Sequence, residues 1–172
     1  SAKDKVLLIS PYFVPGPEVT KGMTALVDKG VTVGIVTNSL AANDVAAVYG
    51  AYRPYRDQLL RGDVHVYELR AQGHPHSSLF GSSGASLHTK AYSVDDARGF
   101  IGSFNLDARS AYLNTEMGVM FDDPLLAKAV RDEYLRLSGP ELSYWMHLDK
   151  NGKPRWLDRA ARPPSMVSTE PD

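Results

Sequence analysis

The sequence predicts an α/β fold whose mixed, mostly parallel sheet is flanked by helices, and two observations support this. Between residues 5 and 69, apolar runs of strand length alternate with segments whose apolar residues recur at helical spacing. Clusters of Pro, Gly, Asn and Ser separate these segments. Such alternation is typical of strands connected by helices, and these connections favour a parallel sheet.

The first half of the chain supplies three strands and two helices. Its predicted strands are 5–10, 31–37 and 64–69. Residues 18–29 and about 44–61 carry apolar side chains at helical spacing, and Gly30 and Gly62 follow them as helix-ending residues.

The second half begins with a polar, Gly- and Ser-rich loop, and its predicted elements follow in order. They are the loop 71–86, strand 86–95, the apolar run 99–101, strand 116–121, a helix capped by Asp123 and ending near 137, a hairpin around Asn151-Gly152, and a tail after Arg159. We therefore expect one domain over residues 1–158 and a weakly ordered tail over residues 159–172.

Composition limits the class of protein. The 172 residues suit one domain, and a formal net charge of −1 gives no overall basic field of the kind that marks non-specific nucleic-acid binding. The chain contains no cysteine and no apolar run near the ~20 residues that span a bilayer. Because the sequence starts without Met, we expect any targeting or anchoring segment to be missing from it.

The stretch 87–116 concentrates residue types that suit phosphate chemistry. It contains His88, Lys90, Asp95, Gly102, Ser103, Asn105 and Glu116. His88 and Lys90 are two apart on a predicted strand and so share a face. One can attack or protonate a phosphate while the other neutralises charge. The hydroxyl and amide of Ser103 and Asn105 can donate hydrogen bonds to phosphate oxygens.

The spacing of this stretch, H-x-K-x4-D followed after six residues by G-S-x-N, resembles the signature of the phospholipase D superfamily. The longer segments GSFNLDARSAYLNTEMGV, SPYFVPG and TNSLAANDVAAVYGAYRPYR resemble the C-terminal half of bacterial cardiolipin synthase-type members. The resemblance covers about residues 5–158. It implies a phospholipase D-like half-domain, the second of two in a longer protein.

The resemblance also implies roles for the residues of the stretch. Superfamily members bring together two such motifs, and one histidine attacks phosphorus to form a phosphohistidine while the other acts as general acid. In a second half-domain His88 is the general acid, although the nucleophile role stays open. Lys90, Ser103 and Asn105 hold the phosphate oxygens, Glu116 orients the catalytic histidine, and Asp95 completes the motif in a structural role. No metal or other cofactor is expected, because His and Lys do the work that a divalent ion does elsewhere.

By the same resemblance, the expected function is phosphatidyl transfer in the manner of a cardiolipin synthase. The alternatives are a hydrolase that releases phosphatidic acid, a homodimeric phosphodiesterase or nuclease, and a catalytically silent half that only docks its partner. The expected partners are a phospholipid, a membrane surface, and either the missing N-terminal half or a second copy, with nucleic acid disfavoured. The expected location is bacterial, either peripheral on a membrane or cytoplasmic.

Several other features have two interpretations. SPYFVPG and TNSL each follow a predicted strand and either form the rim of the site or are ordinary connections. His74 and His76 are interpreted as loop residues rather than metal ligands. Arg109 either adds charge near the phosphate or pairs with Asp107. The aromatic residues of the last hairpin either meet a membrane interface or pack the hairpin; they are Tyr144, Trp145 and Trp156.

Overall fold

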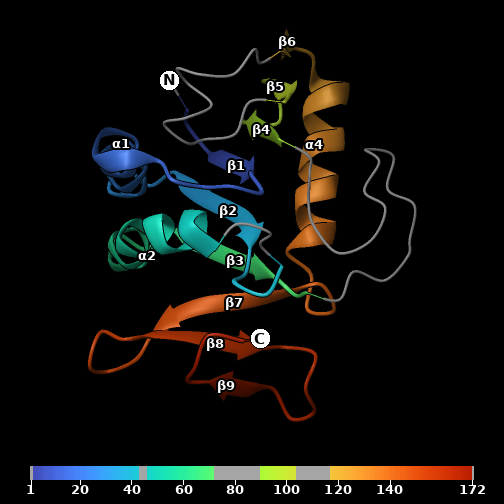
Figure 1. Ribbon diagram of the computed structural model, residues 1–172. Helices are drawn as coiled ribbons and strands as arrows, with labels where there is room; N and C mark the ends of the chain where they lie inside the picture. Colours follow the sequence, from blue (N-terminus) through green and yellow to red (C-terminus); the bar gives the residue numbers. More distant parts are fainter. Residues whose placement is uncertain (1, 43–45, 72–89, 104–116, 172) are drawn as a thin grey trace.

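The computed structural model describes residues 2–42, 46–71, 90–103 and 117–171. Figure 1 shows their arrangement in space. In chain order, the helices and strands are β1 (Lys5–Ile9), α1 (Gly16–Val27), β2 (Thr32–Asn38), α2 (Ala46–Arg61), β3 (His65–Leu69), β4 (Lys90–Val94), β5 (Arg98–Gly102), β6 (Gly118–Asp122), α4 (Pro124–Leu137), β7 (Ser143–Leu148), β8 (Pro154–Asp158) and β9 (Ser165–Val167).

The strands form one mixed sheet in the order β6-β5-β4-β1-β2-β3-β7-β8-β9. The α/β class and the flanking helices are confirmed, but the expectation of a mostly parallel sheet is wrong. Among the described strands, only β1 with β2 and β2 with β3 run parallel, and the other six neighbouring pairs are antiparallel. The reason is the connections: α1 and α2 provide the long crossovers that parallel strands need, whereas short turns join β4 to β5 and β7 to β8.

The helices cover opposite faces of the sheet. In Figure 1, α1 and α2 lie together on one face and α4 lies on the other. Strand β2 serves both sides, because Ile35 packs in the cluster beneath α1 and α2 while Val36 packs with Tyr134 and Leu137 of α4. Gly34 permits the second contact, since a Cβ there would come within 2.1 Å of the Tyr134 hydroxyl oxygen.

Helix α4 begins as the sequence predicts. The Asp123 side chain accepts hydrogen bonds from the backbone N–H groups of Leu125 (2.8 Å) and Leu126 (3.3 Å), and Pro124 follows it as the first helical residue. Such a cap satisfies donors that a helix start otherwise leaves unpaired.

A buried polar cluster joins α2, β3 and β8. Glu68 is fully buried, and its carboxylate accepts a hydrogen bond from the Trp156 indole N–H at 2.7 Å and from the Tyr49 hydroxyl at 3.2 Å. Arg56, 3% exposed, lies 3.7 Å from the same carboxylate. Burial raises the pKa of Glu68, and Arg56 with the two donors only partly offsets this. Trp156 is therefore a core residue.

The other two aromatic residues of the hairpin also pack within the domain. Trp145 stacks on Tyr67 of β3 with ring centroids 5.9 Å apart, and the Arg70 guanidinium lies 3.9 Å from the Tyr144 ring centroid. Both interpretations of these side chains were open at the sequence level, and the structure favours packing of the hairpin.

The segment after residue 158 differs from the weakly ordered tail that the sequence suggests. It includes β9, which pairs with β8 through Trp156–Val167 and two further residue pairs. Glu170 then returns to α2, with its carboxylate 2.9 Å from Arg53 Nε and 3.4 Å from Arg56 Nη1. A strand of three residues beside two prolines has too little periodicity to be recognised in the sequence.

Candidate active site

The described part of the motif lies where three antiparallel strands end together. Lys90 starts β4 and pairs with Gly102 at the end of β5, and Gly102 pairs with Gly118 at the start of β6. Ser103 follows Gly102 and is exposed, whereas Lys90 is half-buried. The strand register therefore brings Lys90, Gly102 and Ser103, which are separated by up to 13 positions in the sequence, to one end of the sheet.

This end is also the carboxyl end of the parallel strands. Ala91, next to Lys90, pairs with Ile9 at the end of β1, and Ile9 pairs with Val36 near the end of β2. The segment SPYFVPG follows the end of β1, and the segment TNSL spans the end of β2. Both therefore lie at the same end of the sheet as Lys90. The Thr37 hydroxyl donates a hydrogen bond to the Pro11 carbonyl at 3.2 Å, which links the two segments. Ligands of open α/β sheets bind at such carboxyl ends.

Glycine is required at Gly102 because of its neighbours. A Cβ at this position would lie 2.6 Å from a ring carbon of Phe100 and 2.6 Å from the Met117 carbonyl oxygen. At Gly118 a Cβ would come within 2.2 Å of the same ring. The two glycines thus accommodate Phe100, which stacks on Tyr92 with centroids 5.8 Å apart and planes at 16°. Sequence reasoning missed Phe100 and Gly118, because only the register brings them beside Lys90.

The Ser103 hydroxyl is bonded to the start of β6. Its oxygen accepts a hydrogen bond from the Met117 N–H at 3.0 Å, and the hydroxyl donates to the Met117 carbonyl at 3.2 Å. The Ser103 N–H donates to the same carbonyl at 2.9 Å. Ser103 therefore continues the pairing of β5 with β6 one residue beyond the strands. Since a hydroxyl can rotate about its C–O bond, the same group can turn its proton toward a ligand.

Asp95 lies at the other end of β4, about 16 Å from Lys90 by the rise of a strand. Its carboxylate accepts hydrogen bonds from the backbone N–H groups of Lys3, Asp4 and Lys5 at 2.9, 2.9 and 3.0 Å. Desolvation raises the pKa of Asp95, but these donors together outweigh it and hold the pKa below its ordinary value. The carboxylate fastens the start of β1 to the β4–β5 turn.

The neighbouring Asp96 makes a different set of contacts. It accepts a hydrogen bond from Lys5 Nζ at 3.0 Å and from Arg131 Nη1 of α4 at 2.7 Å. Desolvation raises the pKa of Asp96, yet the two cations outweigh it and leave the pKa lowered. Asp95 and Asp96 together join β1, the β4–β5 turn and α4.

The remaining residues named in the sequence lie outside the described residues. They are His74, His76, His88, Asn105, Asp107, Arg109 and Glu116. Their positions in the site stay predictions. Within the described ranges, no three His, Asp or Glu residues gather in a way that could hold a metal ion.

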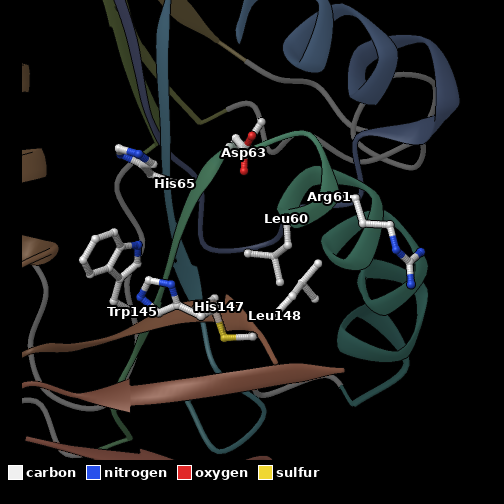
Figure 2. A pocket seen from close by; sticks show the side chains of 9 residues that line it. Leu60, Arg61, Asp63, His65, Trp145, His147 and Leu148 are labelled. Carbon is white, nitrogen blue, oxygen red and sulfur yellow. The ribbon is translucent and has the colours of Figure 1, made fainter. Parts of the chain in front are cut away.

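A pocket of about 490 Å³ lies elsewhere, at the end of the sheet opposite Lys90. Figure 2 shows His65 of β3 beside Trp145 and His147 of β7, with Leu60 and Leu148 across the strands. The ring centroids of Trp145 and His147 are 4.3 Å apart. Burial lowers the pKa of His147, and electrostatic repulsion from the neighbouring His65 and Arg159 side chains lowers it further. Neither histidine belongs to the motif, so this pocket is distinct from the candidate active site.

The fold and the motif together define a phospholipase D-like α/β domain. Over residues 1–138 the sequence matches the family described as "Cardiolipin synthase, PLD-like domain", and the chain belongs to that family. It is 40% identical over 176 residues to cardiolipin synthase C of Escherichia coli K12, covering 99% of this chain and 37% of that protein. It is 30% identical over 141 residues to cardiolipin synthase A of Klebsiella pneumoniae, covering 80% and 26% respectively.

Solved structures share the fold. A phospholipase D family member, Nuc from Salmonella typhimurium, aligns with a TM-score of 0.62 at 20% identity and covers 79% of this chain and 78% of its own. Phosphatidylserine synthase of Haemophilus influenzae aligns with a TM-score of 0.54 at 21% identity, covering 80% and 34%. The match to cardiolipin synthase C covers 99% of this chain, so the chain spans 37% of the length of that relative.

Among the described residues, no helix has both the length and the apolar character that crossing a membrane requires.

Proposed function

We propose that this domain forms half of the active site of a phosphatidyltransferase that acts in the manner of a cardiolipin synthase. The observation that supports this most strongly is the register that sets Lys90 opposite Gly102-Ser103 at the carboxyl end of the parallel strands, in a chain 40% identical to cardiolipin synthase C. A cation and hydrogen-bond donors at such an end suit a phosphate ligand.

The proposed reaction has two steps at one phosphorus atom. In the first, a histidine nitrogen attacks the phosphodiester, the bond from phosphorus to the departing alcohol breaks, and a second histidine gives that alkoxide a proton. In the second, the now neutral second histidine removes a proton from the hydroxyl of an acceptor lipid. That oxygen attacks phosphorus, and the phosphorus–nitrogen bond breaks.

Within this scheme the residues of the chain have separate tasks. His88 is the acid and base, and a histidine from a second motif is the nucleophile. Lys90, Ser103 and Asn105 stabilise the negative charge on the phosphate oxygens, for which pre-placed donors are typically worth about 3 kcal/mol each. Glu116 holds the catalytic histidine in its tautomer. Asp95 supports the domain from a distance, by the contacts described above.

Hydrolysis is the nearest alternative, because it replaces only the acceptor hydroxyl with water. A homodimeric nuclease requires the same two histidines from two copies of the chain, and the net charge of −1 gives it no supporting field. We further propose that the domain meets its lipid at the surface of a bacterial membrane.

The test uses the complete polypeptide that contains this chain. It is incubated with vesicles of phosphatidylglycerol and phosphatidylethanolamine, and the lipid products are weighed by mass spectrometry. His88→Ala is compared with His65→Ala, which alters an exposed histidine at the opposite end of the sheet. We expect cardiolipin from the parent and from His65→Ala, and none from His88→Ala. Cardiolipin formation that survives His88→Ala, or phosphatidic acid as the sole product, would overturn the proposal.

A further inference from the structure

A cavity lined by arginines lies on the flank of the sheet opposite the motif. Its volume is about 320 Å³, and its lining includes Arg53 and Arg56 of α2, Arg155 of β8 and Glu170, which follows β9. We call the cavity and these three arginines the arginine pocket. Strand β8 is five places from β4 in the sheet, roughly 24 Å at the usual strand spacing, and Figure 1 shows the two strands on opposite flanks. The arginine pocket is therefore separate from the candidate active site.

The core holds the Arg56 side chain in a fixed position within this pocket. The side chain is 3% exposed, and the guanidinium carbon lies 5.2 Å from the centre of the Trp156 ring. Carboxylates of Asp57 and Glu68 lie 3.3 and 3.7 Å from its nitrogens. Arg56 thus has counter-charges besides Glu170, and its guanidinium is a pre-organised donor that stays charged.

The Glu170 carboxylate occupies the position that a bound anion would take. Its Oε1 lies 2.9 Å from Arg53 Nε and 3.4 Å from Arg56 Nη1, so one oxygen faces two guanidinium groups. The Arg53 side chain is 56% exposed, and ion pairs that water reaches in this way are weak. A further contact on the same segment is long, because Arg155 Nη1 donates to the Ser168 carbonyl at 3.4 Å. A stronger anion can therefore displace this carboxylate.

A phosphate group suits two guanidinium groups better than a carboxylate does. Guanidinium binds phosphate through pairs of parallel N–H···O bonds, and Glu170 presents a single oxygen to Arg53 and Arg56. A phosphomonoester also carries about 1.5 to 2 negative charges at pH 7 and offers three strong acceptor oxygens. A carboxylate or a phosphodiester carries only a single negative charge. Charge and acceptor number therefore favour a monoester over both.

We propose that the arginine pocket is a binding site for a phosphomonoester group, which displaces Glu170 from Arg53 and Arg56. Bound phosphate pairs with these two arginines, and residues 168–171 leave the pocket. Inorganic phosphate and the headgroup of phosphatidic acid both present this chemistry, so either is a possible source. The site uses neither His88 nor Lys90, and it goes beyond the proposed function without depending on it.

Calorimetric titration of the complete polypeptide with inorganic phosphate tests the site, in a Lys90→Met background that removes the cation of the candidate active site. Glu170→Gln removes the competing charge and should tighten phosphate binding at least about fivefold. Arg53→Gln removes one guanidinium group and should weaken binding at least about tenfold. Arg61→Gln, at another exposed arginine of α2, should leave binding within about twofold of the background. Absence of binding, or equal binding by all four proteins, would overturn the proposal.

Hydrogen–deuterium exchange detects the displacement and distinguishes the two sources of the group. Exchange of the peptide that contains residues 168–171 is followed by mass spectrometry, because a released segment exchanges faster. Inorganic phosphate is compared with phosphatidylcholine vesicles that contain phosphatidic acid, a monoester, or phosphatidylglycerol, a diester. Faster exchange with inorganic phosphate supports a free ligand, and a larger effect of phosphatidic acid at equal phosphate concentration supports a lipid headgroup. Equal acceleration by phosphatidylglycerol, or none with any of the three, would overturn the proposal. Phosphate binding without cardiolipin formation would keep the pocket and remove the proposed function.

Discussion

The two flanks of the sheet have the same strand arrangement, but their side chains make different kinds of contacts. Each extends the parallel centre β1-β2-β3 by three antiparallel strands, β4-β5-β6 on one side and β7-β8-β9 on the other. On the β7 side, polar groups meet partners within the domain: Trp156 with Glu68, Arg70 with Asp158, and Arg155 with Asp149. On the β4 side, Lys90 and Ser103 lie at one end of the sheet, and Met117, Val119 and Met120 are exposed at its edge. The β7 flank is held by these contacts within the domain, and the β4 flank carries the described part of the motif.

The largest expected effect is on the β7 flank. Glu68→Ala removes the fully buried carboxylate that faces Arg56, and it leaves the Trp156 N–H and the Tyr49 hydroxyl without that acceptor, while Arg56 keeps Asp57 and Glu170 as neighbours. Breaking a buried ion pair costs about 3–5 kcal/mol in free energy of unfolding, measured by urea denaturation. Glu170→Ala is the matched control, because Glu170 pairs with the same Arg56 from a more exposed position, and it should cost at most about 1 kcal/mol. Equal losses from both variants would contradict the distinction.

The second prediction concerns the opposite flank, where activity should fall and stability should not. Lys90→Met keeps the length of the side chain and removes its charge, so we expect a drop of about 10²–10³-fold in kcat of the complete polypeptide. Lys153→Met, on the exposed β7–β8 turn, should leave lipid transfer within about twofold of the parent, since surface changes away from a site are nearly neutral. A Lys90→Met enzyme with normal kcat would remove this lysine from the phosphate site.

The third prediction separates two glycines by the space around them. Gly118→Ala pushes a methyl group into the Phe100 ring, 2.2 Å from where its carbon would lie, and should cost about 1–3 kcal/mol. Gly22→Ala, in α1, has no neighbour within 4 Å of the new carbon and should instead add up to about 1 kcal/mol, because alanine favours a helix. Thermal unfolding of both variants would show opposite shifts in Tm. A stabilised Gly118→Ala would mean that Phe100 moves freely.

Much of the local structure could be predicted from the sequence, since it depends on neighbouring residues. The observed bounds of the first three strands and of α1 lie within a few residues of the predicted ones, because buried apolar runs and Gly30 mark them locally. The start of α4 was predicted in the same way from its cap, Asp123. Strand partners could not be predicted, since apolar periodicity says which face is buried but not which strand lies alongside. The mostly parallel sheet was therefore wrong.

The candidate site shows the same division. The spacing of the motif predicts Lys90, Gly102 and Ser103 as site residues, and the register brings these three to one end of the sheet. The reason for a glycine at position 102 depends on Phe100 and Met117, and only the register of β5 with β6 brings these to it. The Glu68–Arg56 pair was likewise invisible, because a glutamate in an apolar strand and an arginine in a helix reveal no partner until α2 lies on β3.

The smallest expected change in the free energy of unfolding comes from Asp95, which joins the β4–β5 turn to the start of β1, and this change depends on pH. The pKa of Asp95 is lowered in the folded protein, so its charged form favours folding above the ordinary pKa of 3.8, and this contribution is lost as the pH falls through the lowered pKa. Asp95→Asn keeps the oxygen that accepts from the N–H groups of Asp4 and Lys5, but it removes the charge and the oxygen that accepts from Lys3, and should cost about 1 kcal/mol at pH 7. Urea denaturation at pH 7 and at pH 3 should show the difference between parent and variant shrinking at the lower pH. A constant difference would mean that shape rather than charge holds β1 to the β4–β5 turn.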